Sequence, residues 1–106
     1  MSYRYMRILV MFDLPMETNE DKRAYRHFRN HLIKSGFFMF QESIYNKVVL
    51  NQQSADAVVD NLEKVKPLGG FVVVLKITEK QFAKMKCLVG ETKTNVIHTD
   101  ERLVFL

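Results

Sequence analysis

The chain has 106 residues, of which 47% are hydrophobic and 26% are charged, a composition that suits one folded domain and excludes a disordered chain. Sixteen lysine and arginine residues against twelve acids give a formal net charge of +4, which favours an anionic partner without naming one. The single cysteine, Cys87, excludes an internal disulfide and a cysteine-based zinc site. Since no stretch has the length of a signal peptide or a membrane span, we expect a cytoplasmic protein with no membrane contact.

The segment 5–12, which holds five consecutive apolar residues over 8–12, predicts a buried first strand. Asp13 follows the run, and Leu14–Pro15 ends the strand because proline cannot donate a hydrogen bond to a neighbouring strand. An aspartate in this place either starts the turn or lies at the rim of the core as a carboxylate that could bind a metal. The local sequence leaves both interpretations open.

The segment 17–36 carries helix signals at both ends. Thr18 or Asn19 suits the N-cap, acids follow in the first turn, and Gly36 suits the C-terminal cap. Apolar residues at four-residue spacing should face the core, and they are Ala24, Phe28 and Leu32, with Tyr25 beside them.

The next segments, 37–41 and 44–50, predict two strands with a very short connection, which forces an antiparallel hairpin or a sharp bend. A second helix is expected over 54–66, before Pro67 and a glycine pair. The residues of this helix that should face inward are Ala55, Val58, Val59 and Leu62.

The last part of the chain begins with a buried strand over 71–77. Thr78 and Gln81 then form a capping-box pair that predicts a short helix. We expect strand-like fragments within a loop over 87–100 and a short C-terminal strand over 102–106.

The order of elements defines an α+β fold of the ferredoxin-like (βαββαβ) type, in a single domain over 1–106. Such a fold has an antiparallel sheet with two helices on one face, and here a short C-terminal strand is added. The other face would be bare, yet Phe12, 37–40 and 72–74 are apolar at consecutive positions. A second copy of the chain is the simplest cover for that face, so we expect a homodimer.

Nearly the whole chain resembles the CRISPR-associated Cas2 family, the small proteins that partner the integrase during spacer acquisition. The resemblance rests on four segments in the family's order, ILVMFDLP, KRAYRHFRNHLIKSGF, QESIYNKVVLN and DERLVFL. Each motif alone is weak, whereas the ordered set is specific. The opening SYRYMR and the closing DERLVFL are most similar to the variants of type II systems.

The resemblance implies a homodimer that bridges integrase subunits and binds double-stranded prespacer DNA. It also implies a magnesium-dependent endonuclease activity, on RNA or DNA, in which the aspartate at the end of the first strand binds the metal, one from each subunit. Asp13 is the matching residue. The C-terminal strand would add to the partner's sheet or contact the integrase, through Arg102, Leu103, Val104, Phe105 and Leu106.

On chemical grounds Asp13 supplies one carboxylate per chain, whereas magnesium takes six oxygen ligands. Two Asp13 side chains across a two-fold axis, with water, could hold the ion, which would screen a phosphate and activate a water. No lysine, histidine or second acid adjoins Asp13 in the sequence to act as a base. Turnover is therefore left open.

A basic stripe on the first helix is the second candidate site. At about 100° per residue its members fall opposite the apolar stripe, and they suit a phosphate backbone. The alternative is an ordinary solvated helix face. The candidates are Lys22, Arg23, Arg26, Arg29 and Lys34, joined by Arg4 and Arg7, which flank the first strand.

Three further features receive structural interpretations. His27 and His31 have the spacing of a metal pair but lack a third ligand, so we expect surface or edge histidines. The phenylalanines of 37–40 should pack in the core, since no RNP motif accompanies them. Cys87 has apolar neighbours and is expected to be buried.

The sequence supports three hypotheses about function. The first is a DNA-binding dimer of CRISPR adaptation, and the second is a metal-dependent endoribonuclease or DNA endonuclease that uses Asp13; the two can coexist. The third is a ferredoxin-like module that binds a small ligand. It is disfavoured because the glycine pair Gly69–Gly70 follows a helix and is expected only to end it.

Overall fold

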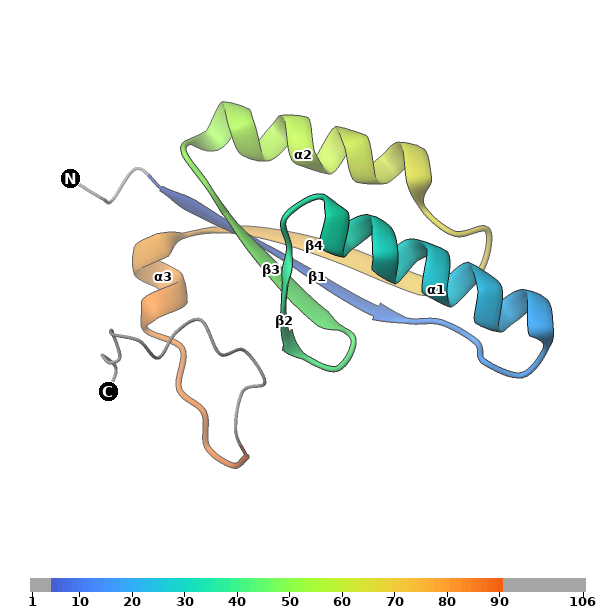
Figure 1. The fold of residues 1–106 in the computed structure, drawn as a ribbon. Coiled ribbons are helices and arrows are strands. Elements are labelled where there is room, and N and C mark those ends of the chain that lie inside the picture. Colours follow the sequence, from blue (N-terminus) through green and yellow to red (C-terminus); the bar gives the residue numbers. More distant parts are fainter. Residues whose placement is uncertain (1–4, 91–106) are drawn as a thin grey trace.

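The computed structural model describes residues 5–90, and Figure 1 shows the elements in that range. Each element expected between these limits is present, and the boundaries move by a few residues at most. The expected strand over 102–106 and Arg4 lie outside the described residues, as does the segment 91–100. The elements are β1 (Met6–Asp13), α1 (Asn19–Lys34), β2 (Phe38–Gln41), β3 (Ile44–Val49), α2 (Gln52–Val65), β4 (Phe71–Thr78) and α3 (Glu79–Ala83).

The strands form one antiparallel sheet in the order β2-β3-β1-β4. In β1, one of the two inner strands, Val10 lies opposite Tyr45 of β3 on one side and Val74 of β4 on the other. Figure 1 shows α1 and α2 together on one side of the sheet. This is the split βαβ arrangement, so the prediction of an α+β ferredoxin-like fold is confirmed.

The ends of α1 follow the signals in the sequence. Thr18 is the N-cap: its hydroxyl accepts the Asp21 N–H at 3.0 Å, and the Asp21 carboxylate accepts the Thr18 N–H at 3.1 Å. At the other end Gly36 takes a φ of 93°, which a residue with a side chain rarely adopts. Of the two N-cap candidates, Thr18 and Asn19, Thr18 is therefore the one that caps the helix.

Helix α2 begins two residues earlier than the sequence predicts. The Asn51 side chain accepts the Ser54 N–H at 2.8 Å and so caps a helix that starts at Gln52. An ion pair of 2.6 Å between Lys76 Nζ and Asp56 Oδ1 joins this helix to β4. The hydrogen bond from Lys76 lowers the pKa of Asp56 below its ordinary value.

The core lies between the sheet and the helices α1 and α2. Phe12 is at its centre: its ring meets that of Phe28 edge-on at 5.3 Å between centroids and stacks on Tyr45 at 5.8 Å. The expected inward residues Leu32, Ala55 and Leu62 are buried, whereas Val58 and Val59 are half-buried. The buried cluster comprises Ile8, Val10, Phe12, Leu14, Phe28, Leu32, Phe37, Tyr45, Val49, Ala55 and Leu62.

One residue of the expected apolar stripe departs from the prediction. Ala24 is exposed, although Phe28 and Leu32 are buried and Tyr25 is half-buried. The reason is that Ala24 borders a groove between α1 and the end of α2 rather than the sheet.

None of the helices described within 5–90 has the length and apolar character of a membrane-spanning helix.

Candidate functional site

The sheet face turned away from α1 and α2 is apolar and partly exposed. Side chains alternate along a strand and paired residues share a face, so Leu9 and Met11 lie on this face with their register partners. Phe38, Phe71 and Leu75 are 53%, 60% and 46% exposed. Arg7 and Asn46 share this face, Phe82 of α3 packs against Arg7 and Phe40, and Leu9 is buried, so only part of the face is exposed. Large apolar side chains exposed on one sheet face mark an interaction surface. The apolar side chains of this "open face" are Leu9, Met11, Phe38, Phe40, Ile44, Val48, Phe71, Val73, Leu75 and Ile77.

The phenylalanine-rich segment divides between the two faces. Phe37 is buried and Met39 packs against the core, as expected. Phe38 is exposed on the open face, and the Phe40 ring lies 5.8 Å from that of Phe82 in α3. The prediction of core packing is therefore right for Phe37 and wrong for Phe38, because alternation along β2 turns Phe38 away from the helices.

Asp13 lies at the rim of the open face. It is the last residue of β1, is exposed, and pairs in register with Phe71. Within 5–90 no side chain forms a hydrogen bond or ion pair with its carboxylate. The carboxylate is therefore available to a ligand that approaches from the open face.

A single chain does not build a magnesium site around Asp13. No group of three or more histidine, cysteine, aspartate or glutamate side chains gathers anywhere in 5–90. Magnesium is usually bound through one or two carboxylates together with water and substrate phosphates, so the single Asp13 of one chain would hold it weakly. A second Asp13, brought by another copy of the chain through the open face, would supply a pair of carboxylates, so the residues fit the metal better in a dimer.

The turn after Asp13 is held by Gly70, a role that no pattern in the sequence revealed. A Cβ added to Gly70 would lie 2.6 Å from Leu14 Cδ2 and 3.1 Å from both the Asp13 carbonyl oxygen and Pro15 Cδ. Gly70 also has a φ of 90°, which favours glycine. The start of β4 thus packs directly on the Asp13–Pro15 turn and positions the acid.

Gly70→Ala should lower the free energy of unfolding by about 1–3 kcal/mol, because both the φ angle and the close neighbours oppose a side chain. Gly69→Ala is the matched control, since a Cβ there meets nothing within 4 Å. Urea denaturation of both variants measures the difference. Equal stability of the two variants would show that Gly70 does not hold the turn.

The basic residues of α1 lie in two groups on its exposed face and do not form one patch. Arg29 is half-buried and its Nε donates to the Tyr45 hydroxyl at 3.0 Å, whereas the other four are exposed. At about 100° per residue, Lys22, Arg26 and Arg29 share one flank, and Arg23 and Lys34 lie on the other. We call the set Lys22, Arg26 and Arg29 the "basic flank".

Arg7 makes intramolecular contacts that the sequence did not reveal. Its guanidinium donates to both carboxylate oxygens of Glu79 at 2.9 and 2.6 Å and to Asn46 Oδ1 at 2.7 Å. It also lies 4.1 Å from the centroid of the Phe82 ring. Arg7 therefore ties α3 to the sheet, and its charge is already paired, so it is a poor DNA ligand.

Of the predictions for the histidines of α1 and for Cys87, the first is confirmed and the second is wrong. His27 is exposed and His31 half-buried, with the His31 Nε2 atom 3.4 Å from the Ser35 hydroxyl, in line with surface or edge histidines. Cys87 is exposed, so the prediction of a buried thiol is wrong. Its neighbours Leu88 and Val89 are also exposed, which is why their apolar character misled the prediction.

The fold and the site together define a ferredoxin-like protein with an exposed apolar sheet face and a carboxylate at its rim. The family model described as "CRISPR associated protein Cas2" matches residues 6–85. The chain belongs to this family, as the resemblance of its motifs predicts, and the prediction of a protein of CRISPR adaptation is confirmed.

Individual relatives show how far the similarity extends. The chain is 54% identical over 101 residues to "CRISPR-associated endoribonuclease Cas2" of Treponema denticola, which covers 95% of this chain and 100% of that protein. It is 45% identical to the protein of the same description from Streptococcus mutans, over 95% of this chain and 93% of that one. A crystal structure of Cas2 matches the fold with a TM-score of 0.58, at 16% identity, over 86% of this chain and 93% of that chain.

Proposed function

We propose that the chain acts in spacer acquisition as a homodimer that bridges integrase subunits and binds double-stranded prespacer DNA. The observation that carries this proposal is the open face, on which Phe38, Phe71 and Leu75 are each about half exposed. Burial of apolar surface in an interface stabilises the complex by roughly 25 cal/mol for each Å² removed from water. A two-fold dimer covers the same patch on both copies at once.

The DNA part of the proposal rests on the charge of the chain and the placement of its cations. The net charge is +4, and the basic flank brings Lys22, Arg26 and Arg29 together on one side of α1. Such contacts to phosphates position a duplex without reading its sequence. Arg7 does not contribute, because Glu79 already pairs with it.

A second candidate function is a magnesium-dependent endonuclease that uses paired Asp13 residues. The named relatives are described as endoribonucleases, which favours RNA as the substrate. Magnesium, when bound, would screen the phosphate and supply an activated water. Asp13 would hold the ion from each copy, and the packing of Gly70 would keep the Asp13 turn in place.

The proposal is tested by mixing the purified chain, the integrase and a DNA duplex, and measuring masses by size-exclusion chromatography with light scattering. We expect one complex that contains two copies of the chain together with integrase and duplex. A chain that elutes as a monomer at micromolar concentration, apart from the integrase, would overturn the proposal.

Deleting residues 102–106 should weaken association with the integrase or within the dimer more than it lowers the stability of the fold. A short terminal strand offers edge hydrogen bonds to a partner sheet, and the buried cluster of the described residues is formed by residues between Ile8 and Leu62. Thermal unfolding and complex formation are measured on the same truncated protein. Intact assembly, or a truncated chain that does not fold, would contradict the expectation.

A further inference from the structure

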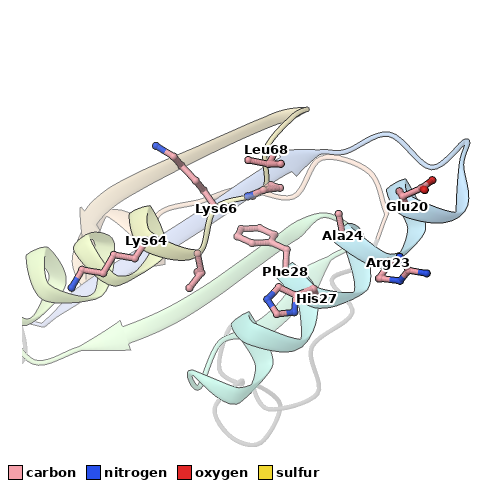
Figure 2. A pocket seen from close by; sticks show the side chains of 10 residues that line it. Glu20, Arg23, Ala24, His27, Phe28, Lys64, Lys66 and Leu68 are labelled. Carbon is pink, nitrogen blue, oxygen red and sulfur yellow. The ribbon is translucent and has the colours of Figure 1, made fainter.

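A groove of about 580 Å³ lies between α1 and the segment that joins α2 to β4 (Figure 2). Its centre is apolar: Phe28 forms the floor and is 1% exposed, whereas Leu68 at the edge is fully exposed. Ala24, Val65 and Pro67 complete the apolar lining. Figure 2 shows the Phe28 side chain pointing toward the loop that carries Leu68. The volume falls within the range of ligand sites, roughly 300–1,000 Å³.

The rim of the groove is mainly basic. Arg23 and His27 stand on the α1 side, and Lys64 stands at the end of α2. Within 5–90 neither Arg23 nor Lys64 is engaged in an ion pair. Lys66 is already paired with Glu63 at 3.1 Å, and Glu20 is an acid at the α1 end of the rim. Two unpaired cations of the described chain thus border an apolar floor.

The combination of an apolar floor and a mainly basic rim suits a peptide better than a nucleic acid. A phosphate backbone would gain from Arg23 and Lys64 but not from the apolar strip between them, and Glu20 would repel it at one end. A polypeptide can place an apolar side chain on the strip and carboxylates at the rim, so each part of the groove finds a complementary group.

We propose that the groove docks a short acidic segment of a partner protein, in which one or two large apolar side chains are flanked by aspartate or glutamate. The apolar side chain fills the space above Phe28 and beside Leu68, and the acids pair with Arg23 and Lys64. The groove is formed by the helix layer, on the other side of the sheet from the open face, so dimer formation leaves it accessible. The inference therefore goes beyond the proposed function.

The test uses the full chain and a short fluorescein-labelled peptide that alternates aspartate with leucine and phenylalanine. Fluorescence anisotropy gives the affinity, and amide chemical shifts locate the site. We expect shifts at Ala24 and Leu68. We also expect Leu68→Asp, and separately the double change Arg23→Glu with Lys64→Glu, to weaken binding by about tenfold or more.

Lys84→Glu with Lys86→Glu is the matched control, because it also reverses two charges, on exposed lysines that do not line the groove, and should leave the affinity unchanged. A second peptide with lysine in place of aspartate should bind at least about tenfold more weakly. Equal binding of the two peptides, equal weakening in the control, or chemical shifts confined to the open face would overturn the proposal. So would groove shifts that appear with a DNA duplex and not with the peptide. The mass of the dimer is measured separately, so a failure here is distinct from a failure of the proposed function.

Discussion

Leu75→Glu is expected to convert the proposed dimer into a monomer at micromolar concentration. Leu75 is 46% exposed on the open face, beside Leu9 in the register of β1 and β4. In a two-fold dimer the substitution places two carboxylates in an apolar interface, and the penalty for an unpaired buried charge is several kcal/mol each. We expect the dissociation constant to rise by on the order of a hundredfold or more.

Light scattering over a concentration series measures this change. Leu68→Glu is the matched control, because it introduces the same charge in place of an equally large and more exposed leucine on the helix side of the sheet. That variant should remain dimeric. A dimer that survives Leu75→Glu and is abolished by Leu68→Glu would place the interface on the helix side instead of the open face.

The double change Lys22→Ala and Arg26→Ala is expected to weaken duplex DNA binding regardless of base sequence. Both side chains belong to the basic flank outside the buried core, so their removal takes away charges that we propose face phosphates without disturbing the core. The slope of log affinity against log salt should fall by about 0.9 for each phosphate that the variant no longer neutralises. Arg29 is kept, because its removal would leave the buried hydroxyl of Tyr45 without its hydrogen-bond partner.

The matched control removes two charges elsewhere, through Lys64→Ala and Lys66→Ala at the end of α2. Titrations of a labelled duplex at several salt concentrations compare the two variants. The salt slope of the control should stay at that of the unaltered chain. If the affinity of the control falls as far as that of the Lys22 and Arg26 variant, net charge rather than the basic flank determines the binding.

The elements of the fold could be predicted because their signals are local. Thr18 caps α1 and Thr78 with Gln81 caps α3 through hydrogen bonds between residues close in the sequence. The apolar runs of β1 and β4 identify strands by composition alone. The prediction that 71–77 is a buried strand is wrong, because β4 lies at the edge of the sheet and none of its residues is buried. The ferredoxin-like order then follows from the sequence of elements.

Interactions between residues far apart in the sequence could not be predicted. Arg7 meets Glu79 across the fold, and no local pattern shows that its charge is paired. Gly70 has the sequence context of a helix stop, whereas its closeness to the Asp13 turn depends on how β4 returns beside β1. The exposure of Phe38 depends on which face the helices cover, which apolar composition alone does not specify.

Asp13 illustrates the limit for the candidate site. Its place at the end of the first strand follows from the sequence, and the structure puts it at the rim of the open face. The pairing that a metal would require involves a second copy of the chain, and neither the sequence nor the geometry of one chain contains that pair. Asp13 as a metal ligand therefore stays a prediction tied to the dimer.

Spacer integration by the purified integrase, together with the chain in its unaltered, Leu75→Glu and Asp13→Ala forms, tests the central claim most directly. A dimer that bridges the integrase and binds DNA predicts that Leu75→Glu abolishes integration. It predicts that Asp13→Ala retains integration while any magnesium-dependent cleavage disappears, because DNA binding rests on the basic flank. Failure of integration with Asp13→Ala, in a complex that still assembles and binds DNA, would contradict the account and make the chemistry of Asp13 essential to the main function.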